Sequence, residues 1–528
     1  MEKRLRKGNR VSVLTADEAV KYIPDNSTVG FCGAGGGLTE ATIVIEALAK
    51  RYKETQEPRN LTYYHSTGLG DRADRGMSPL AQKGMVKRIV GGHWGQSPRL
   101  AEMAERNEIE AYNFPQGVVT QLLRTAAAGQ PGILTHVGLG TFADPRQQGG
   151  KLNECTKEDL IRIMKVNGRE YLFYPVTPID VAIIRGTTSD TEGYISMEDE
   201  IAYLDALALA QAAHNNGGIV IAQVQKLVKA RSLHPKSVKI PGFLVDALVV
   251  VPEQPQLYSG SINRFMSGDY IMDSGEVIPL PLNERKVIAR RALMEVKQGD
   301  VGNVGVGIAD GIGVVAREES VSEEFTLTVE TGPIGGVSAQ GIFFGASVNM
   351  QAMLDMPTQF DFYDGGGLDV CFLSFAELDQ YGNVNVHKFN GKIMGTGGFV
   401  NICQNTKKVI FCGTLTAGGL KVAVEDGKVI IKQEGKFEKM ISKVPEITFN
   451  GGDAIKRGQE VIYITERAVF KLTEKGMELC EIAPGMDLEK DIVSKMGFTP
   501  IVSSDLKEMD HRLFADSPMN IKKEQFNI

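Results

Sequence analysis

The residues from Phe325 to Glu330 alternate between apolar and polar side chains with a period of two. This period is typical of a β-strand whose two faces meet different surroundings. Thr331-Gly332-Pro333 and Gly335-Gly336 follow directly and predict that the strand ends in a sharp turn. Glu330 is therefore expected at a strand end, with little side-chain bulk behind it. In an open α/β sheet this is the edge where ligands collect; the alternative is a solvated strand-end charge.

The first half of the chain alternates apolar strand patterns with amphipathic helical patterns, which predicts a mostly parallel sheet covered by helices. A capping box from Thr15 to Glu18 begins the first helix, which ends near Tyr22, and Thr156 is expected to begin another helix over 157–166. The loop 138–150 is long enough to be functional or mobile. The other predicted helices cover 39–52, 97–105, 118–127 and 203–214, and the predicted strands cover 27–32, 61–65, 87–90, 110–113, 170–174, 181–185, 219–228 and 245–251.

Residues 252–280 are rich in Pro, Ser and Gly and show little periodicity, and we interpret them as a linker. After this linker, the order of helix, strand, turn and helix found near the N-terminus recurs, and the segment 407–413 resembles 217–226. Such repetition predicts two related α/β domains, residues 1–280 including the linker and residues 281–528.

The second half is expected to add antiparallel strands to its parallel sheet. Asp426-Gly427 lies between two apolar runs and predicts a hairpin. The remaining predicted elements of this half are helices over 284–297, 311–318, 399–404 and 487–496, strands over 302–307, 368–375 and 409–412, and an antiparallel group over 461–481.

Size, charge and cysteine usage limit the class of protein. The 528 residues are too many for one hydrophobic core, so two or more domains are expected. A net charge of −7 supplies no basic field for nucleic acid or an anionic membrane. No apolar run approaches the ~20 residues that span a bilayer, and no apolar core of a secretion signal follows the basic N-terminal segment. Six scattered cysteines and seven histidines without paired spacing predict a cytoplasmic protein with reduced thiols and no metal site.

Backbone N–H groups of three glycines and one side-chain amide elsewhere in the chain could assist a reaction at Glu330. Gly395, Gly397 and Gly398 leave backbone N–H groups bare at a predicted helix start, and Gln116 offers an amide at another helix start. Such donors around a reacting carbonyl are what an oxyanion hole requires, and a carboxylate can act as a covalent nucleophile. Each residue also has a plainer interpretation, as part of a turn or a helix cap.

Three other patterns are weaker indications of a binding or catalytic site. Gly33 to Gly37 follows a strand, but the third glycine of a dinucleotide-binding motif would fall on Leu38, so we prefer a backbone turn. His93 stands beside the only tryptophan and is interpreted as a packed or hydrogen-bonded histidine. Ser504 to Lys507 matches S-x-x-K, but the companion motifs of that enzyme class are missing.

Short motifs in both halves match one known pattern. They are GGHW, YNFPQG, GTFADPR, GGKLN and EYLFYP in the first half, and VETGPIGG, FGAS, FDFYDGGGLDVCFL, GNVNV, GTGGF, QNTKKVIFCGT and TAGGLKV in the second. Together they resemble family I CoA-transferases, most closely the single-chain propionate/acetate type. The resemblance covers nearly the whole chain, and one departure is the glycine-rich loop GFCGAGGG, which matches the family only loosely.

The resemblance implies a covalent mechanism centred on Glu330. This residue matches the nucleophilic glutamate of the family, which attacks an acyl-CoA and then carries CoA as a glutamyl-CoA thioester. A second carboxylate takes the CoA by the reverse steps, in ping-pong order. Gln116 would supply the amide of the oxyanion hole, and Gly397 and Gly398 its backbone N–H groups.

The resemblance also implies the ligands and the assembly. Coenzyme A is a co-substrate, with Gly395 and Phe399 near it, and no cofactor is bound permanently. Short-chain acids such as acetate and propionate are the expected substrates, with the first domain on the carboxylic acid side. The site is expected between two related open α/β domains, in a homo-oligomer (a dimer or a tetramer).

Two functions of other classes compete with this one. A sugar-phosphate isomerase would need a basic clamp for phosphate, and Lys226, Lys229 and Arg231 are as readily a solvated face. A non-catalytic acyl-CoA sensor would keep the glycine turns but would need no nucleophile. Exchange of acetate with acetyl-CoA distinguishes the transferase from the sensor.

Overall fold

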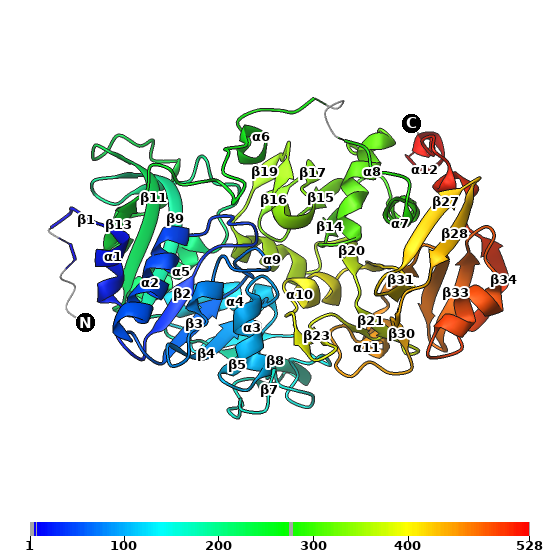
Figure 1. The fold of residues 1–528 in the computed structure, drawn as a ribbon, viewed down its shortest axis with the longest axis horizontal. Coiled ribbons are helices and arrows are strands. Elements are labelled where there is room, and N and C mark those ends of the chain that lie inside the picture. Colours follow the sequence, from blue (N-terminus) through cyan, green and yellow to red (C-terminus); the bar gives the residue numbers. More distant parts are fainter. Residues whose placement is uncertain (1–4, 7, 274–277, 527–528) are drawn as a thin grey trace.

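The computed structural model describes residues 5–6, 8–273 and 278–526. Two sheets, each of ten strands, form the two halves of the molecule, which lie side by side in Figure 1 with the N-terminal half on the left. Residues 274–277 of the predicted linker lie outside the described residues. The predicted domain limits, 1–280 and 281–528, stay a prediction.

The first sheet has an uninterrupted parallel path. Its strands are apolar on both faces where helices cover them, as in β9 (Val181–Asp190), which is buried along its whole length. Two short strands extend it beside β9: β10 (Ile195–Ser196) pairs antiparallel with β9, and β12 (Val238–Ile240) pairs antiparallel with β10. The path runs β1 (Ser12–Leu14), β13 (Ala247–Val250), β11 (Ile219–Val228), β9, β2 (Thr28–Phe31), β3 (Leu61–His65), β4 (Val86–Gly91) and β5 (Glu110–Asn113).

The second sheet has a parallel centre with antiparallel strands at both sides. The order is β19 (Ala352–Met353), β16 (Pro333–Ile334), β15 (Thr326–Thr328), β14 (Val301–Val304), β20 (Val370–Ser374), β25 (Lys408–Cys412), β31 (Glu460–Ile464), β32 (Ala468–Thr473), β33 (Gly476–Ile482) and β34 (Ile501–Glu508). Strands β15, β14, β20, β25 and β31 are parallel, whereas β16, β19, β32 and β33 join by antiparallel pairing. The predicted fold class, mostly parallel α/β sheets with antiparallel additions in the C-terminal half, is confirmed.

The two sheets share a five-strand parallel core. Its order is β13-β11-β9-β2-β3 in the first half and β31-β25-β20-β14-β15 in the second. Strands β11 and β25 occupy equivalent places, which accounts for the likeness of residues 217–226 to 407–413. Strand β15, which leads to Glu330, is the equivalent of β3, which leads to Ser66 and Thr67.

Helices from both halves meet along the seam between the sheets. The helix α4 (Gln116–Ala127) of the first half contacts α9 (Met356–Asp364) and α10 (Phe399–Gln404) of the second, and all three lie near the centre of Figure 1. The other long helices are α2 (Thr42–Thr55), α3 (Pro98–Glu105), α5 (Ala206–Asn215), α7 (Glu284–Leu293) and α8 (Ile312–Glu318). One apolar cluster contains buried side chains of both halves, including Val118 of α4 and Phe360 of α9.

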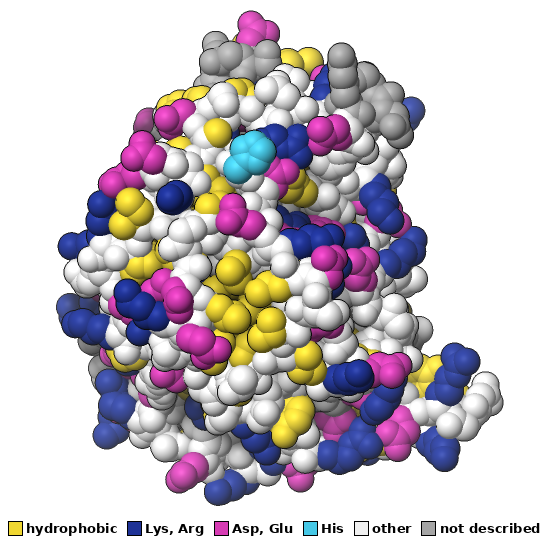
Figure 2. Space-filling model, turned by 90° about the vertical axis from the view of Figure 1, so that its right-hand side faces the viewer, with side chains coloured by type: hydrophobic (Ala, Val, Ile, Leu, Met, Phe, Trp, Pro, Cys, Tyr) yellow, Lys and Arg dark blue, Asp and Glu magenta, His cyan; other side chains and the backbone are white. Residues whose placement is uncertain are grey.

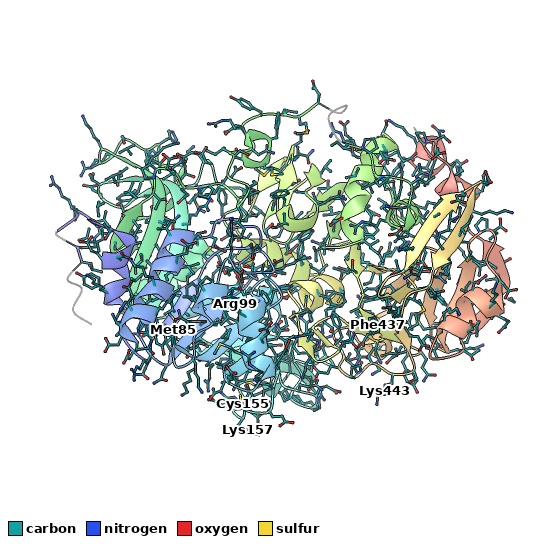
Figure 3. The ribbon with its side chains drawn as sticks, viewed as in Figure 1. Met85, Arg99, Cys155, Lys157, Phe437 and Lys443 are labelled. Carbon is teal, nitrogen blue, oxygen red and sulfur yellow. The ribbon has the colours of Figure 1, made fainter. Side chains whose placement is uncertain are left out.

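The helix predicted over 157–166 is wrong. Residues 162–166 form β7 (Arg162–Val166), which pairs antiparallel with β8 (Arg169–Pro175), and the Thr156 hydroxyl accepts a hydrogen bond from the Ala111 N–H. The turn between the strands is Asn167-Gly168, both with positive φ, and Asn-Gly is a strong hairpin signal. Figure 3 labels Cys155 and Lys157 at the lower edge of the molecule, just before this small sheet.

Other element boundaries differ from the sequence-based expectation. The helix predicted over 284–297 ends at Leu293, and the helix predicted over 487–496 is a π-helical turn, Leu488–Ile492, followed by a 3-10 turn, Val493–Lys495. The last helix, α12 (Lys522–Phe526), was not predicted. The Ser97 hydroxyl, at the start of the helix predicted over 97–105, does not cap α3 and donates to the Leu69 carbonyl. The capping box at Thr15 and the hairpin at Asp426-Gly427 are confirmed.

The segment after β13 is attached to the first half through Tyr258. Its ring lies against Gly37, its N–H donates to the Gly36 carbonyl, and its hydroxyl contacts both carboxylate oxygens of Glu40 at 2.7 and 2.8 Å. Burial raises the pKa of Glu40 to about 7, and the hydrogen bond from Tyr258 counters this shift. Tyr258, a residue of the predicted linker, thus attaches this segment to the glycine loop that follows β2.

Replacing Tyr258 with phenylalanine is expected to lower the free energy of unfolding by about 1–3 kcal/mol, because a buried carboxylate loses a donor. The loss should be larger at pH 8 than at pH 6, since Glu40 is ionised above its pKa of about 7. Urea unfolding at both pH values measures the effect. Tyr270→Phe is the control, because Tyr270 is an exposed tyrosine of the same segment. Equal stability of the Tyr258 variant and the wild type would contradict the anchoring role.

The end of the molecule formed by the C-terminal half carries charges of both signs. Figure 2 shows lysine, arginine and acidic side chains interspersed on this face, around a group of hydrophobic side chains near its centre. The part of this face that the structure describes therefore has no continuous basic surface of the kind that binds nucleic acid. Within the described part of the chain, no helix is long and apolar enough to cross a membrane.

Candidate active site

A cavity of about 390 Å³ opens at the seam between the two sheets. Residues of both halves line it, and all six of the residues singled out from the sequence are among them: Gln116, Glu330, Gly395, Gly397, Gly398 and Phe399. The glycine loop after β2 contributes Ala34 and Gly35, and the turn after β3 contributes Thr67 and Gly68. Tertiary folding has therefore gathered residues from widely separated stretches of the chain around one space.

Glu330 lies in the turn that follows β15, as the strand pattern predicted. The residue is half-buried, and its Oε2 atom is fully buried without a hydrogen-bond partner among the described residues. Burial raises the pKa of Glu330 to about 7, and a backbone hydrogen bond at the residue itself lowers it by less. Such a carboxylate is poorly solvated and therefore more nucleophilic than one in water.

Gln116 is the first residue of α4 and is buried at the cavity wall. Its backbone N–H donates to the Gly397 carbonyl at 3.0 Å, across the seam. Among the described residues, its side-chain Nε2 has one hydrogen-bond partner, the Met356 thioether at 3.3 Å, which is a weak acceptor. The amide therefore keeps a strong donor available to a ligand in the cavity.

The turn Gly395–Gly398 is held from the first half by backbone hydrogen bonds. The Gly397 N–H donates to the Gly92 carbonyl at 2.8 Å, and the Thr396 N–H donates to Asn113 Oδ1 at 3.0 Å. Gly397 has a positive φ of 55°, and Gly398 is the residue before α10. No described residue accepts a hydrogen bond from the Gly398 N–H. Of the two N–H groups predicted to face an oxyanion, only that of Gly398 is free to do so.

His93 lines the cavity, which the sequence did not indicate. Burial lowers its pKa to about 4, so the ring is neutral near pH 7, and its Nδ1 atom is buried without a partner. Gln96, from the same loop, lines the cavity as well, and its Oε1 atom is also buried and unpartnered. No spacing or motif pointed to Gln96, because its place depends on how the loop folds back against Gly35.

The remaining sequence candidates lie outside the cavity. Lys226 pairs with Asp199 at 3.2 Å, and Arg231 is exposed beside Glu192, so neither faces the seam. Ser504 and Lys507 lie on β34, an exposed strand at the far edge of the second sheet. Among the described residues, no group of three or more His, Cys, Asp or Glu side chains could hold a metal ion.

Comparison with known proteins agrees with this geometry. Residues 13–251 match the Coenzyme A transferase family. The chain is 64% identical to the acetate CoA-transferase YdiF of Escherichia coli K12 over 97% of both chains, and 44% identical to the caffeate CoA-transferase of Acetobacterium woodii over 95% of this chain and 97% of that one. It superimposes with a TM-score of 0.94, at 62% identity, on a crystal structure of the acyl-CoA transferase YdiF of Escherichia coli O157:H7 in a thioester complex with CoA, which covers 97% of this chain and 98% of that one.

These relatives span the whole chain, so the likeness includes both halves and the cavity between them. The isomerase and sensor alternatives have no such support. Glu330 lies in the cavity that residues of both halves line. The chain belongs to the family I CoA-transferases.

Proposed function

We propose that this enzyme moves coenzyme A between a short-chain acyl-CoA and a free carboxylate of the acetate or propionate type, through a glutamyl-CoA thioester on Glu330. The observation that carries the proposal is the buried, unpartnered Oε2 atom of Glu330 in a cavity shared by both halves. An unsatisfied buried carboxylate is costly to maintain, and such groups are typical of sites where chemistry occurs.

The first half-reaction transfers CoA from the donor to the enzyme. A Glu330 oxygen attacks the thioester carbonyl carbon, and the resulting oxyanion collapses with cleavage of the C–S bond. The products are an acyl-glutamyl anhydride and the CoA thiolate. The thiolate then attacks the glutamyl carbonyl, which releases the first carboxylate and leaves CoA bound to Glu330 as a thioester. The glutamyl-CoA thioester replaces the acyl-CoA thioester, so the free energy of the thioester bond is conserved.

The second half-reaction repeats these steps in reverse. The acceptor carboxylate attacks the glutamyl thioester, which releases the CoA thiolate and forms a second mixed anhydride. The thiolate attacks the acyl carbon of this anhydride and regenerates the free Glu330 carboxylate. No proton has to be gained or lost overall, which is consistent with the lack of a dedicated acid–base pair in this proposal.

Gln116 and Gly398 are proposed to stabilise the oxyanions. Within the described part of the chain, the amide of Gln116 has only a thioether partner and the Gly398 N–H has none, so both can donate without breaking a strong hydrogen bond. Gly397 is proposed to shape the turn, since its own N–H is used by Gly92. Phe399 and Gly395 line the same cavity and are proposed to lie close to CoA.

The acid specificity and the assembly are part of the proposal. The acetate CoA-transferase YdiF supports a short monocarboxylic acid as substrate, because it matches along the whole chain. Coenzyme A is the co-substrate, with no permanently bound cofactor. We further propose that the protein is cytoplasmic and forms a homo-oligomer. Each subunit would have two domains, residues 1–280 and 281–528.

We expect kcat/KM to rise with pH up to about 7 and to level off above it. The ionised Glu330 is the attacking form, and burial raises its pKa to about 7. Below this value the rate should fall about tenfold per pH unit. Initial rates with acetyl-CoA and propionate, in buffers that keep the enzyme folded, measure the profile. A rate that is flat from about pH 5.5 to about pH 8.5 would argue against a buried carboxylate nucleophile.

Isotope exchange tests the proposed activity directly. Purified enzyme should exchange labelled acetate into acetyl-CoA without any third substrate, because the glutamyl thioester forms and reverses. Borohydride or hydroxylamine added to enzyme loaded with acetyl-CoA should change the mass of the peptide that contains Glu330. Binding of acetyl-CoA without exchange, or a mass change on another peptide, would reject the mechanism.

A further inference from the structure

Helix α4, which starts at Gln116, has no capping side chain of its own. The residue before it is Pro115, and no described side chain of the first half accepts a hydrogen bond from its first N–H groups. The acceptor comes from the second half, because Asn401 Oδ1 receives the Gly117 N–H at 3.0 Å. These two residues are 284 positions apart in the sequence.

The orientation of the Asn401 amide is determined by its partners. Since Oδ1 must face the Gly117 N–H, Nδ2 faces the other way, and it donates to both oxygens of Asp364 at 2.9 and 3.2 Å. Asp364 also accepts from Gln121 of α4 at 2.9 Å. Asn401 is buried, and the hydrogen bonds form a chain from α9 through α10 to the start of α4.

Gly117 makes this close approach possible. A Cβ on Gly117 would lie within 2.7 Å of the Asn401 amide and the Phe360 ring, so only a glycine fits. The adjacent Gln116 N–H donates to the Gly397 carbonyl. The first two N–H groups of α4 are therefore both held by residues of the second half, one on each side of the Gln116 side chain.

We propose that Asn401, oriented by Asp364, is a positioning residue that caps α4 from the opposite half and so aims the Gln116 amide into the cavity. Neither residue lines the cavity, so they act through Gln116 and not on the substrate. This inference rests on the proposed role of Gln116 in the oxyanion hole. A loss of the cap lets the start of α4 move relative to Gly398, and a misplacement of about 1 Å can cost about 10²-fold in rate.

Asn401→Asp is the most informative variant. In this variant one carboxylate oxygen at position 401 still accepts the hydrogen bond from the Gly117 N–H, but the other replaces Nδ2 and faces the Asp364 carboxylate. Two carboxylates within hydrogen-bond distance repel each other unless they share a proton. The ratio of variant to wild-type kcat should therefore be near one at about pH 6 and fall by about 10- to 10²-fold by about pH 8.5, with KM changed less than about 3-fold. Taking the ratio cancels the titration of Glu330. The other titratable or charged groups around the pair are Asp361, Arg124 and Tyr174.

The reciprocal exchange supplies a rescue. In Asn401→Asp combined with Asp364→Asn, the new Asp accepts from Gly117 and from the new Asn, whose oxygen accepts from Gln121. The double variant should recover kcat to within about 3-fold of wild type at every pH, because each hydrogen bond of the chain is restored with the same net charge. A merely structural role would change the unfolding temperature and would not produce this pH-dependent loss and recovery of kcat.

Asn450→Asp is the matched control. Asn450 also crosses the seam, since its Nδ2 donates to the Gly140 carbonyl at 3.0 Å, but it lies at α11 (Gly451–Arg457), away from Gln116. This variant should keep wild-type kcat at every pH. Asn401→Ser, whose shorter side chain cannot reach Gly117, should lower kcat about tenfold and serves if the aspartate variant does not fold.

Two results would overturn the inference: wild-type kcat for Asn401→Asp at alkaline pH, or no recovery in a folded double variant. Both can occur in an enzyme that forms the Glu330 thioester normally, so they are distinct from failure of the proposed function. That failure would appear as the absence of acetate exchange in the wild type.

Discussion

Glu330→Gln is expected to abolish CoA transfer, with a loss of at least about 10⁴-fold in kcat. The amide has nearly the same shape, but it carries no charge and cannot form the anhydride or the thioester. Since every proposed step passes through a bond to this side chain, no other group in the cavity can replace it. The exchange of labelled acetate into acetyl-CoA measures the loss, and Glu330→Ala should give the same result.

The glutamine variant should remain folded. Ionisation of a carboxyl whose pKa is raised by burial is unfavourable to the folded state, so the wild type loses stability as the pH rises from about 4.5 to about 7. An amide has no such penalty, and Glu330→Gln should unfold at an equal or higher temperature than the wild type at pH 8. Glu323→Gln, at an exposed position before the same strand, is the control and should retain full activity. Near wild-type turnover of the Glu330 variant would exclude Glu330 as the nucleophile.

Gln116→Leu is expected to lower kcat by about 10²- to 10³-fold, because one donor to the oxyanion is lost. The substrate carbonyl carries less charge than the tetrahedral intermediate, so KM should change much less than kcat. Single-turnover formation of the glutamyl thioester, followed by mass, measures the chemical step without product release. Leucine keeps the volume of the side chain and leaves the backbone hydrogen bond from residue 116 to Gly397 in place.

Gln130→Leu provides the comparison for this second variant. Gln130 is an exposed glutamine just after α4, and its replacement should leave kcat unchanged. If Gln116→Leu raised KM while kcat stayed the same, Gln116 would contribute to ground-state binding and the oxyanion assignment would be wrong. The asparagine that caps α4 would then have no catalytic consequence either, so the two experiments inform one another.

Much of the fold was predictable because strand and helix patterns depend on near neighbours in the chain. The apolar strands 61–65 and 219–228 and the hairpin at Asp426-Gly427 have the predicted form, whereas the strand before Glu330 is shorter than predicted and covers Thr326–Thr328. The prediction over 157–166 is wrong because the turn at Asn167-Gly168 reverses the chain and pairs β7 with β8, and this pairing outweighs the local capping signal of Thr156.

The sequence by itself determined the α/β class, the repeated order of elements and, through its motifs, the family to which the chain belongs. It also indicated the residues that meet at the seam. Only the tertiary structure decided which of their polar atoms remain free. Gly397 and Gly398 are alike as sequence, yet the Gly397 N–H is taken by Gly92 and the Gly398 N–H is not.

The tertiary structure also decided the positions of the groups that no motif indicated. His93 and Gln96 reach the cavity, and Asn401 caps a helix of the other half, because the two sheets meet along a seam that joins distant parts of the chain. Burial, and with it the raised pKa of Glu330, is likewise a property of that seam. The physical reason is that desolvation and hydrogen-bond satisfaction depend on what surrounds an atom in space, and residues far apart in the sequence supply most of those surroundings.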